Sequence, residues 1–233
     1  MPRQKQSNQS NGPVWQDPSS YDALVHGPPY MPSMKLASQD RNRVRTAAQE
    51  ARPLAVEAMN VIARRSKEAL LDVPVEMMAE GKAMNYKPLA DLLVVYRGVT
   101  AVHLTHHWQT RGGHYYADHL LLQRIYEETQ ALIDPMAERT VGLGHWLLVD
   151  AVTQARALAD LVGLLTPGGK VPPENMIQTS YNATLFAISA IEMVIKRLDE
   201  AGLMTAGLDD LLPAHAGVFE GHGYLLGQRL SAD

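Results

Sequence analysis

Apolar residues recur every three or four positions along most of the chain, which is the spacing of one face of an α-helix. The pattern predicts an amphipathic helix over residues 40–72, kinked at Pro53. It then predicts four long helices, with a shorter helix between the second and third. Their expected ranges are about 88–110, 114–143, 146–165 for the short one, 174–202 and 208–230.

Four long helices that follow a variable N-terminal region are typical of an all-α fold, a four-helix bundle, here expected over residues 85–233. Residues 1–40 are rich in Pro, Gly, Ser, Gln and Asn, which predicts a flexible or strapping tail. Residues 41–84 are then expected to form a helical N-terminal extension.

Composition narrows the chemistry. The 233 residues include no Cys, which excludes disulfides, Cys nucleophiles and Cys-zinc sites and leaves His and carboxylates as metal ligands. No apolar run approaches the roughly 18 residues that span a bilayer, and the polar N-terminus does not resemble a signal peptide. We therefore expect a cytoplasmic protein without a membrane partner.

Charge is distributed unevenly. Residues 1–67 contain ten Lys and Arg against five Asp and Glu, whereas residues 68–233 contain eleven against twenty. A basic N-terminus attracts polyanions, and an acidic body gathers cations.

Histidines and carboxylates provide the candidate chemistry. Five His fall within seventeen residues, and two of them, His103 and His107, lie four apart on one helical face, the spacing at which two imidazoles can share a metal. Asp134 and Glu138 are also four apart, which suits a hard or borderline ion such as iron. The structural alternatives are histidines that hydrogen-bond within the bundle and an ordinary solvated acidic face.

The spacing along the second helix also limits how a site could form. His119 and Asp134 are 15 residues apart, or roughly 22 Å at 1.5 Å per residue. One chain cannot bring both residues to the same ion. If they share a site, the carboxylates come from a second copy across a two-fold axis.

The segment 107–144 resembles the Dps family of mini-ferritins, in the ferritin-like superfamily. It contains HW-x-x-x-G at 107–112, a second His twelve residues after the first, D-x-x-x-E at 134–138 followed by Arg, and a closing Leu-Gly. The spacings match without a gap over 38 residues, and the resemblance extends loosely over about 85–233.

The resemblance implies a ferritin-like four-helix bundle with a short extra helix between helices B and C, assembled as a shell of twelve subunits. It also implies a ferroxidase that oxidises Fe²⁺ to Fe³⁺ with hydrogen peroxide or oxygen and stores the product. In this family the site lies at a two-fold interface, with His107 and His119 facing the partner's Asp134 and Glu138. Trp108 corresponds to a Trp near the iron, for which a packed core position is the structural alternative.

Two positions depart from the family pattern. Residue 123 is Gln where the family has Asp, and a neutral amide is a poorer iron ligand than a carboxylate, so oxidation is expected to be weakened. Candidates for a compensating ligand lie nearby, namely His103, His106, His114 and Asp118. Pro135 lies inside the predicted second helix and should bend it beside the proposed ligands.

The resemblance also suggests two further roles. Some family members bind DNA without sequence preference through basic tails, and the candidates here are Arg3, Lys5, Arg41, Arg43 and Arg45. DNA binding would place the protein at the bacterial nucleoid. Asp209 and Asp210 resemble carboxylates that line iron-entry pores, although isolated surface acids are the alternative.

Three functions are compatible with this sequence. The first is an iron-oxidising and iron-storing shell that protects against Fe²⁺ and peroxide. The second is a DNA-binding or architectural shell whose metal site is impaired at Gln123. The third is a non-redox site for zinc or another divalent metal.

Overall fold

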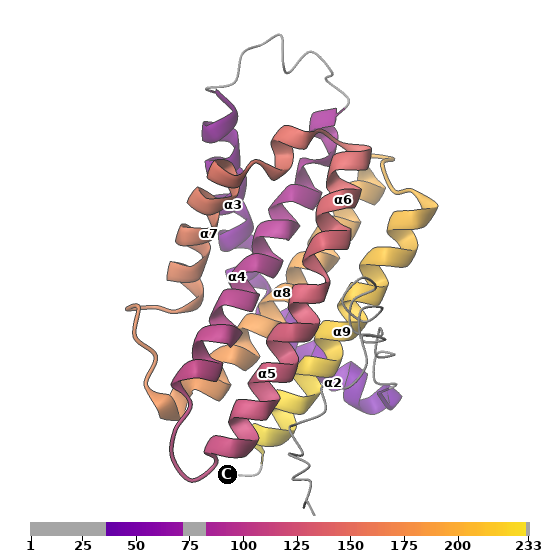
Figure 1. Cartoon of the computed structure of the whole chain (residues 1–233). Coiled ribbons are helices and arrows are strands. Elements are labelled where there is room, and N and C mark those ends of the chain that lie inside the picture. The colour runs from indigo at the N-terminus through magenta and orange to yellow at the C-terminus, as the bar shows by residue number, and fades with distance from the viewer. Residues whose placement is uncertain (1–35, 72–82, 232–233) are drawn as a thin grey trace, which may run out of the picture. The chain divides into compact units, whose positions relative to one another are not determined.

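The computed structural model describes residues 36–71 and 83–231. Within these residues the regular structure is helical (Figure 1). The helices are α2 (Ser38–Glu50), α3 (Arg52–Leu71), α4 (Lys87–Gln109), α5 (Tyr115–Ala131), α6 (Ile133–Leu143), α7 (Ala151–Leu165), α8 (Met176–Glu200) and α9 (Ala206–Leu230), with short 3₁₀ turns η3 (Ala83–Tyr86), η4 (Trp146–Val149) and η5 (Pro173–Asn175). No helix in the described ranges is long and apolar enough to cross a membrane.

The bundle consists of α4, the pair α5 and α6, α8 and α9, which run side by side in Figure 1. Helix α4 is apolar on nearly all sides because α5, α7 and α8 all pack against it. Fully buried aromatic residues join the helices in the core, among them Tyr96 of α4, Phe186 of α8 and Phe219 of α9. The expected all-α four-helix bundle with an additional helix, α7, before the third long helix is confirmed.

The predicted second helix, 114–143, is in fact two helices. Pro135 has no N–H to donate to the carbonyl of Ala131, so the ladder is interrupted there. The chain makes a tighter turn instead, in which the Leu132 N–H donates to the Thr129 carbonyl at 3.1 Å. A bend was expected at Pro135 itself. The helix instead breaks at Leu132, three residues before the proline.

The predicted helix at 40–72 is also two helices, since α2 ends at Glu50 and Pro53 occupies the second position of α3. Helix α3 packs against α7, and α7 packs against α4 where Gly98 leaves room for Leu161.

Helix α2 lies against α8 and α9. Val44 fits against Gly223, and the Ser189 hydroxyl donates to the Ala48 carbonyl. Arg41 and Arg45 both pair with the buried carboxylate of Glu220, at 3.2 and 2.6 Å. The helical part of the N-terminal extension is thus packed on the bundle. The domain limits stay predictions, because residues 1–35 and 72–82 lie outside the described part.

Candidate metal centre

His107 and His119 form a stacked pair where α4 and α5 approach their connecting loop. Their ring centroids are 3.8 Å apart, with 23° between the ring planes. Gly112, with φ of 97°, provides the left-handed backbone conformation that reverses the chain between the two helices. The two most specific histidines of the sequence pattern are therefore brought together within one chain.

The main chain fixes the orientation of both rings. The Nδ1 of His107 lies 3.0 Å from the His119 carbonyl oxygen, and the Nδ1 of His119 lies 3.0 Å from the His107 carbonyl oxygen. A carbonyl oxygen can only accept, so each Nδ1 carries the proton and donates. In the neutral ring Nε2 then carries the free lone pair. This is the tautomer that metal-binding histidines adopt when a carbonyl holds their other nitrogen.

Aromatic side chains surround the pair. The Tyr126 ring meets His107 edge-on at 5.2 Å, and the Tyr115 ring stacks on His119 at 5.2 Å. Trp108 is 68% exposed, so it is not a core residue, and Tyr116 beside it is 73% exposed. The histidine pair therefore packs against two tyrosine rings, of which Tyr115 is itself 46% exposed.

Gln123 lies one turn after His119, and the acidic residue Glu127 follows it by one further turn. The Gln123 Nε2 donates to Glu127 Oε1 at 2.9 Å, and the Tyr126 hydroxyl donates to the same oxygen at 3.4 Å. Because the amide nitrogen is used in this way, the Gln123 carbonyl oxygen remains available to a cation. Sequence reasoning missed Glu127, although the four-residue spacing from His119 through Gln123 to Glu127 was a usable signal.

Asp134 and Glu138 lie in the first half of α6, and both are exposed. An open cavity of about 350 Å³ adjoins Glu138 and is also lined by Arg139 and Leu211. The chain does not bring these carboxylates to the histidine pair: among residues 36–71 and 83–231, no three His, Asp or Glu side chains are grouped closely enough to hold a metal ion.

His103 points into the bundle rather than towards the stacked histidine pair. Its Nε2 lies 3.3 Å from the Thr184 hydroxyl, and its Nδ1 has no partner within the described residues. Burial lowers the pKa of His103 well below its usual value, so the ring is neutral.

The remaining predicted residues lie elsewhere. Asp209 and Asp210 are exposed in the first turn of α9. Arg41 and Arg45 are engaged by Glu220, Arg43 is exposed on α2, and Arg3 and Lys5 are outside the described residues. DNA binding and a pore role stay predictions.

Comparisons with known proteins agree with this architecture. No protein-family model matches the chain. General stress protein 20U of Bacillus subtilis (strain 168) is 25% identical over 121 residues, which are 52% of this chain and 79% of that protein.

Two solved structures share the fold. Dps from Thermosynechococcus elongatus aligns with a TM-score of 0.55 and 21% identity, over 66% of this chain and 94% of that one. DpsC from Streptomyces coelicolor aligns with a TM-score of 0.52 and 24% identity, over 63% and 83%. The bundle thus has a Dps-like, ferritin-like fold.

Proposed function

We propose that this chain, which has the fold of the Dps structures, oxidises Fe²⁺ and stores the product as a subunit of a Dps-like shell. His107 and His119 of one subunit bind the iron, and Asp134 and Glu138 of a second subunit complete the site. The proposal rests chiefly on the carbonyl-held histidine pair, because it presents two Nε2 lone pairs without any need for the rings to rearrange.

The need for a second subunit follows from the spacing. His119 is near the start of α5 and Asp134 is in α6, 15 residues further along the chain. A two-fold axis that sets two such helix pairs antiparallel creates two equivalent sites.

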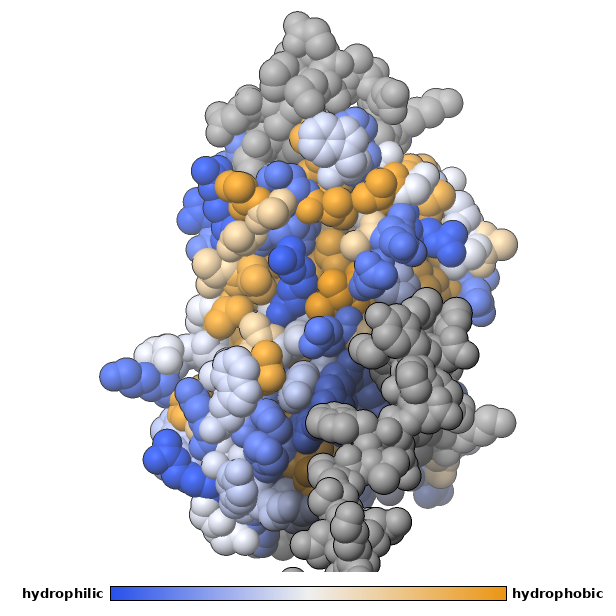
Figure 2. Space-filling model, in the orientation of Figure 1, coloured by the Kyte–Doolittle hydropathy of each residue, from blue (hydrophilic) through white to orange (hydrophobic). Residues whose placement is uncertain are grey.

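Exposed apolar side chains near both half-sites favour a second copy of the chain as the partner. Trp108, Tyr116 and Leu120 adjoin the histidines in sequence, and Val141 and Trp146 follow Glu138; all five are at least 40% exposed. Figure 2 shows hydrophobic residues gathered over the upper part of the viewed face, where α6 and the start of α4 lie, which is the carboxylate half; the histidine half lies at the opposite end of α4. Apolar surface near both halves of an incomplete site is expected where two copies pair.

The two residue types have separate roles in the reaction. Neutral imidazoles suit Fe²⁺, and carboxylates are hard anionic ligands that favour the Fe³⁺ product. Two Fe²⁺ ions give up one electron each, and these two electrons break the O–O bond of one hydrogen peroxide, which takes up two protons and leaves as two water molecules. Gln123 contributes an amide oxygen without charge, so we propose that Fe²⁺ binds more weakly than at a site with a third carboxylate.

The proposed shell contains twelve subunits. A mass in solution of about 300 kDa, twelve times the 25.6 kDa of one chain, is the expected result. A monomer or a lone dimer would contradict the storage role.

Mixing subunits tests the shared site. His119→Ala and Asp134→Ala each remove one half of every site, so neither variant alone should form ferric product from Fe²⁺ and peroxide. After both are unfolded and refolded together, half of the pairs are mixed, and each mixed pair has one intact site. We expect recovery of about one quarter of wild-type ferric absorbance.

The matched control mixes His107→Ala with His119→Ala. Both changes fall in the same half-site, so mixing cannot create an intact site and activity should stay absent. Equal recovery in both mixtures would contradict the two-chain site. Binding of Zn²⁺ at the histidines without any ferric product in wild-type protein would instead support a non-redox metal site.

A further inference from the structure

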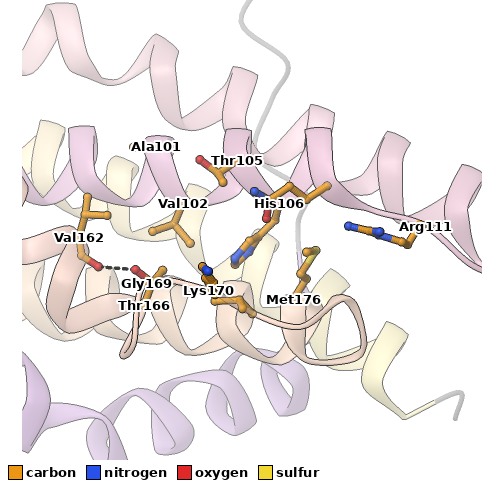
Figure 3. Close-up of a pocket in the computed structure, with 12 residues that line it drawn as sticks. Ala101, Val102, Thr105, His106, Arg111, Val162, Thr166, Gly169, Lys170 and Met176 are labelled. Carbon is orange, nitrogen blue, oxygen red and sulfur yellow. Dashed lines mark hydrogen bonds between the residues drawn. The ribbon is translucent and has the colours of Figure 1, made fainter.

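A second cavity lies away from the stacked histidines, between the end of α4, the end of α7 and the start of α8. Its volume is about 330 Å³, within the range of small-ligand sites. One wall of the cavity is apolar and is formed by Val102, Val162 and Met176 (Figure 3).

The rim of this cavity is positively charged. Arg111 follows α4 and Lys170 lies in the loop after α7; both line the cavity, and neither pairs with a carboxylate in the described part of the chain. No Asp or Glu lines the cavity. In a chain with a net charge of −4, this is a local excess of positive charge, which attracts anions.

A buried histidine supplies an N–H donor at the floor. His106 is 1% exposed, and its Nδ1 lies 2.8 Å from the Ser180 hydroxyl. Ser180 is fully buried, and its hydroxyl has no other acceptor among the described residues, so it donates to Nδ1.

In that tautomer the ring proton is on Nε2, which has no acceptor in the described protein. Figure 3 shows the His106 ring directed towards Lys170 and the Arg111 guanidinium extending towards the same space. A polar N–H at the base of a cavity with two cations at its mouth matches an oxyanion whose oxygens need several donors.

We propose that this cavity binds a small phosphate monoester. Lys170 and Arg111 bind the phosphate oxygens, the His106 Nε2–H donates to one of them, and the organic group packs against Val102, Val162 and Met176. The site is independent of iron oxidation and would exist whether or not the metal centre is active.

Calorimetric titration of the full, metal-free protein tests the site, with inorganic phosphate and phenyl phosphate as the two probes. We expect both to bind, and phenyl phosphate to bind more tightly because only it has an apolar group to bury. Lys170→Gln or Arg111→Gln should weaken either probe by about ten-fold, the worth of one charge-assisted hydrogen bond.

Arg156→Gln is the matched control, since Arg156 is an exposed cation on α7 that does not line the cavity. If Arg156→Gln weakened the binding of the probes as much as Lys170→Gln and Arg111→Gln do, the protein would attract anions through its overall charge, and the proposal would be overturned. Unchanged binding in the Lys170 and Arg111 variants would also overturn it.

Histidine ¹H–¹⁵N spectra test separately whether the His106 Nε2–H binds the anion. Phenyl phosphate should move the Nε2–H signal of His106, because a new acceptor reaches that proton. No change at His106 on saturation with phenyl phosphate would show that the anion does not enter this cavity.

Discussion

Gln123 and Glu127 form a hydrogen-bonded pair on the same face of α5 as His119. The carboxylate holds the amide nitrogen and leaves the amide oxygen free, so a residue without charge can still serve as a ligand. Glu127 carries a negative charge one turn further along the helix. Whether Gln123 acts as a ligand can be tested at that single residue.

Changing Gln123 should alter metal affinity in a fixed order. We expect Gln123→Asp to bind Co²⁺, a redox-stable substitute for Fe²⁺, about ten-fold more tightly, because a carboxylate adds charge as well as an oxygen. Gln123→Ala should bind it more weakly than wild type because the oxygen is lost. Visible absorption of bound Co²⁺ measures both.

Gln130→Asp is the control for general charge, since it adds one carboxylate to an exposed position of the same helix. If this variant gains as much affinity as Gln123→Asp, the effect is long-range attraction and not ligation. Equal affinity of Gln123→Ala and wild type would remove Gln123 from the site.

Helix packing depends on a close approach at Gly98. A Cβ added there would lie 2.6 Å from Leu161 Cδ2 and 3.2 Å from Leu161 Cγ, and Leu161 is fully buried. We expect Gly98→Ala to lower the free energy of unfolding by about 1–3 kcal/mol, the usual cost of overpacking a core. Urea unfolding followed by circular dichroism measures the change.

Gly163 on α7 is the matched control, because nothing lies within 4 Å of a Cβ built there. Gly163→Ala should raise stability by up to about 1 kcal/mol through helix propensity alone. A loss of stability in Gly163→Ala, or none in Gly98→Ala, would contradict the packing argument.

The helices were predictable because apolar spacing and the glycine and proline signals are local. The positions of the breaks were less so. Pro135 indicated a disruption, but the chain turns three residues earlier, at Leu132, where the Leu132 N–H donates to the Thr129 carbonyl in a tighter turn. The attachment of α2 through Glu220 could not be predicted, because Arg41 and Glu220 meet only in three dimensions.

The same limit applies to the metal centre. The spacing of His107, His119, Asp134 and Glu138 identified the candidates, and the structure brings the two histidines together. The hydrogen bonds from the two rings to main-chain carbonyls could not be predicted from the sequence, because the spacing of side chains does not determine which backbone atom a ring contacts. Glu127 could have been found from its spacing.

Stability of the whole bundle should depend on four buried histidines: His103, His106, His215 and His222. Burial lowers the pKa of each, for His106 and His215 to about 4. In the unfolded chain a histidine has a pKa of about 6.5. As the pH falls, the unfolded state therefore takes up protons at a higher pH than the folded state does. The contribution of the neutral histidines to the free energy of unfolding is complete above pH 6.5 and is lost as the pH falls from there towards 4.

At pH 5 the expected loss is about 2 kcal/mol for each of His106 and His215 relative to pH 7. Urea midpoints at the two pH values measure it. His215→Gln keeps an acceptor for the Tyr96 hydroxyl but cannot take up the proton. Between pH 7 and pH 5 its free energy of unfolding should therefore fall by about 2 kcal/mol less than that of the wild type. An identical pH dependence in wild type and His215→Gln would rule out this contribution.

The reciprocal hydrogen bonds of the stacked histidines have one more consequence. Each imidazole is held by an atom that every amino acid possesses, so replacing one histidine by alanine deletes a ligand without releasing the other ring. The surviving imidazole should keep its tautomer and its aim. The backbone, and not the neighbouring side chain, thus fixes the orientation of each ring. A single substitution at His107 or His119 should therefore remove one metal ligand and leave the other in place.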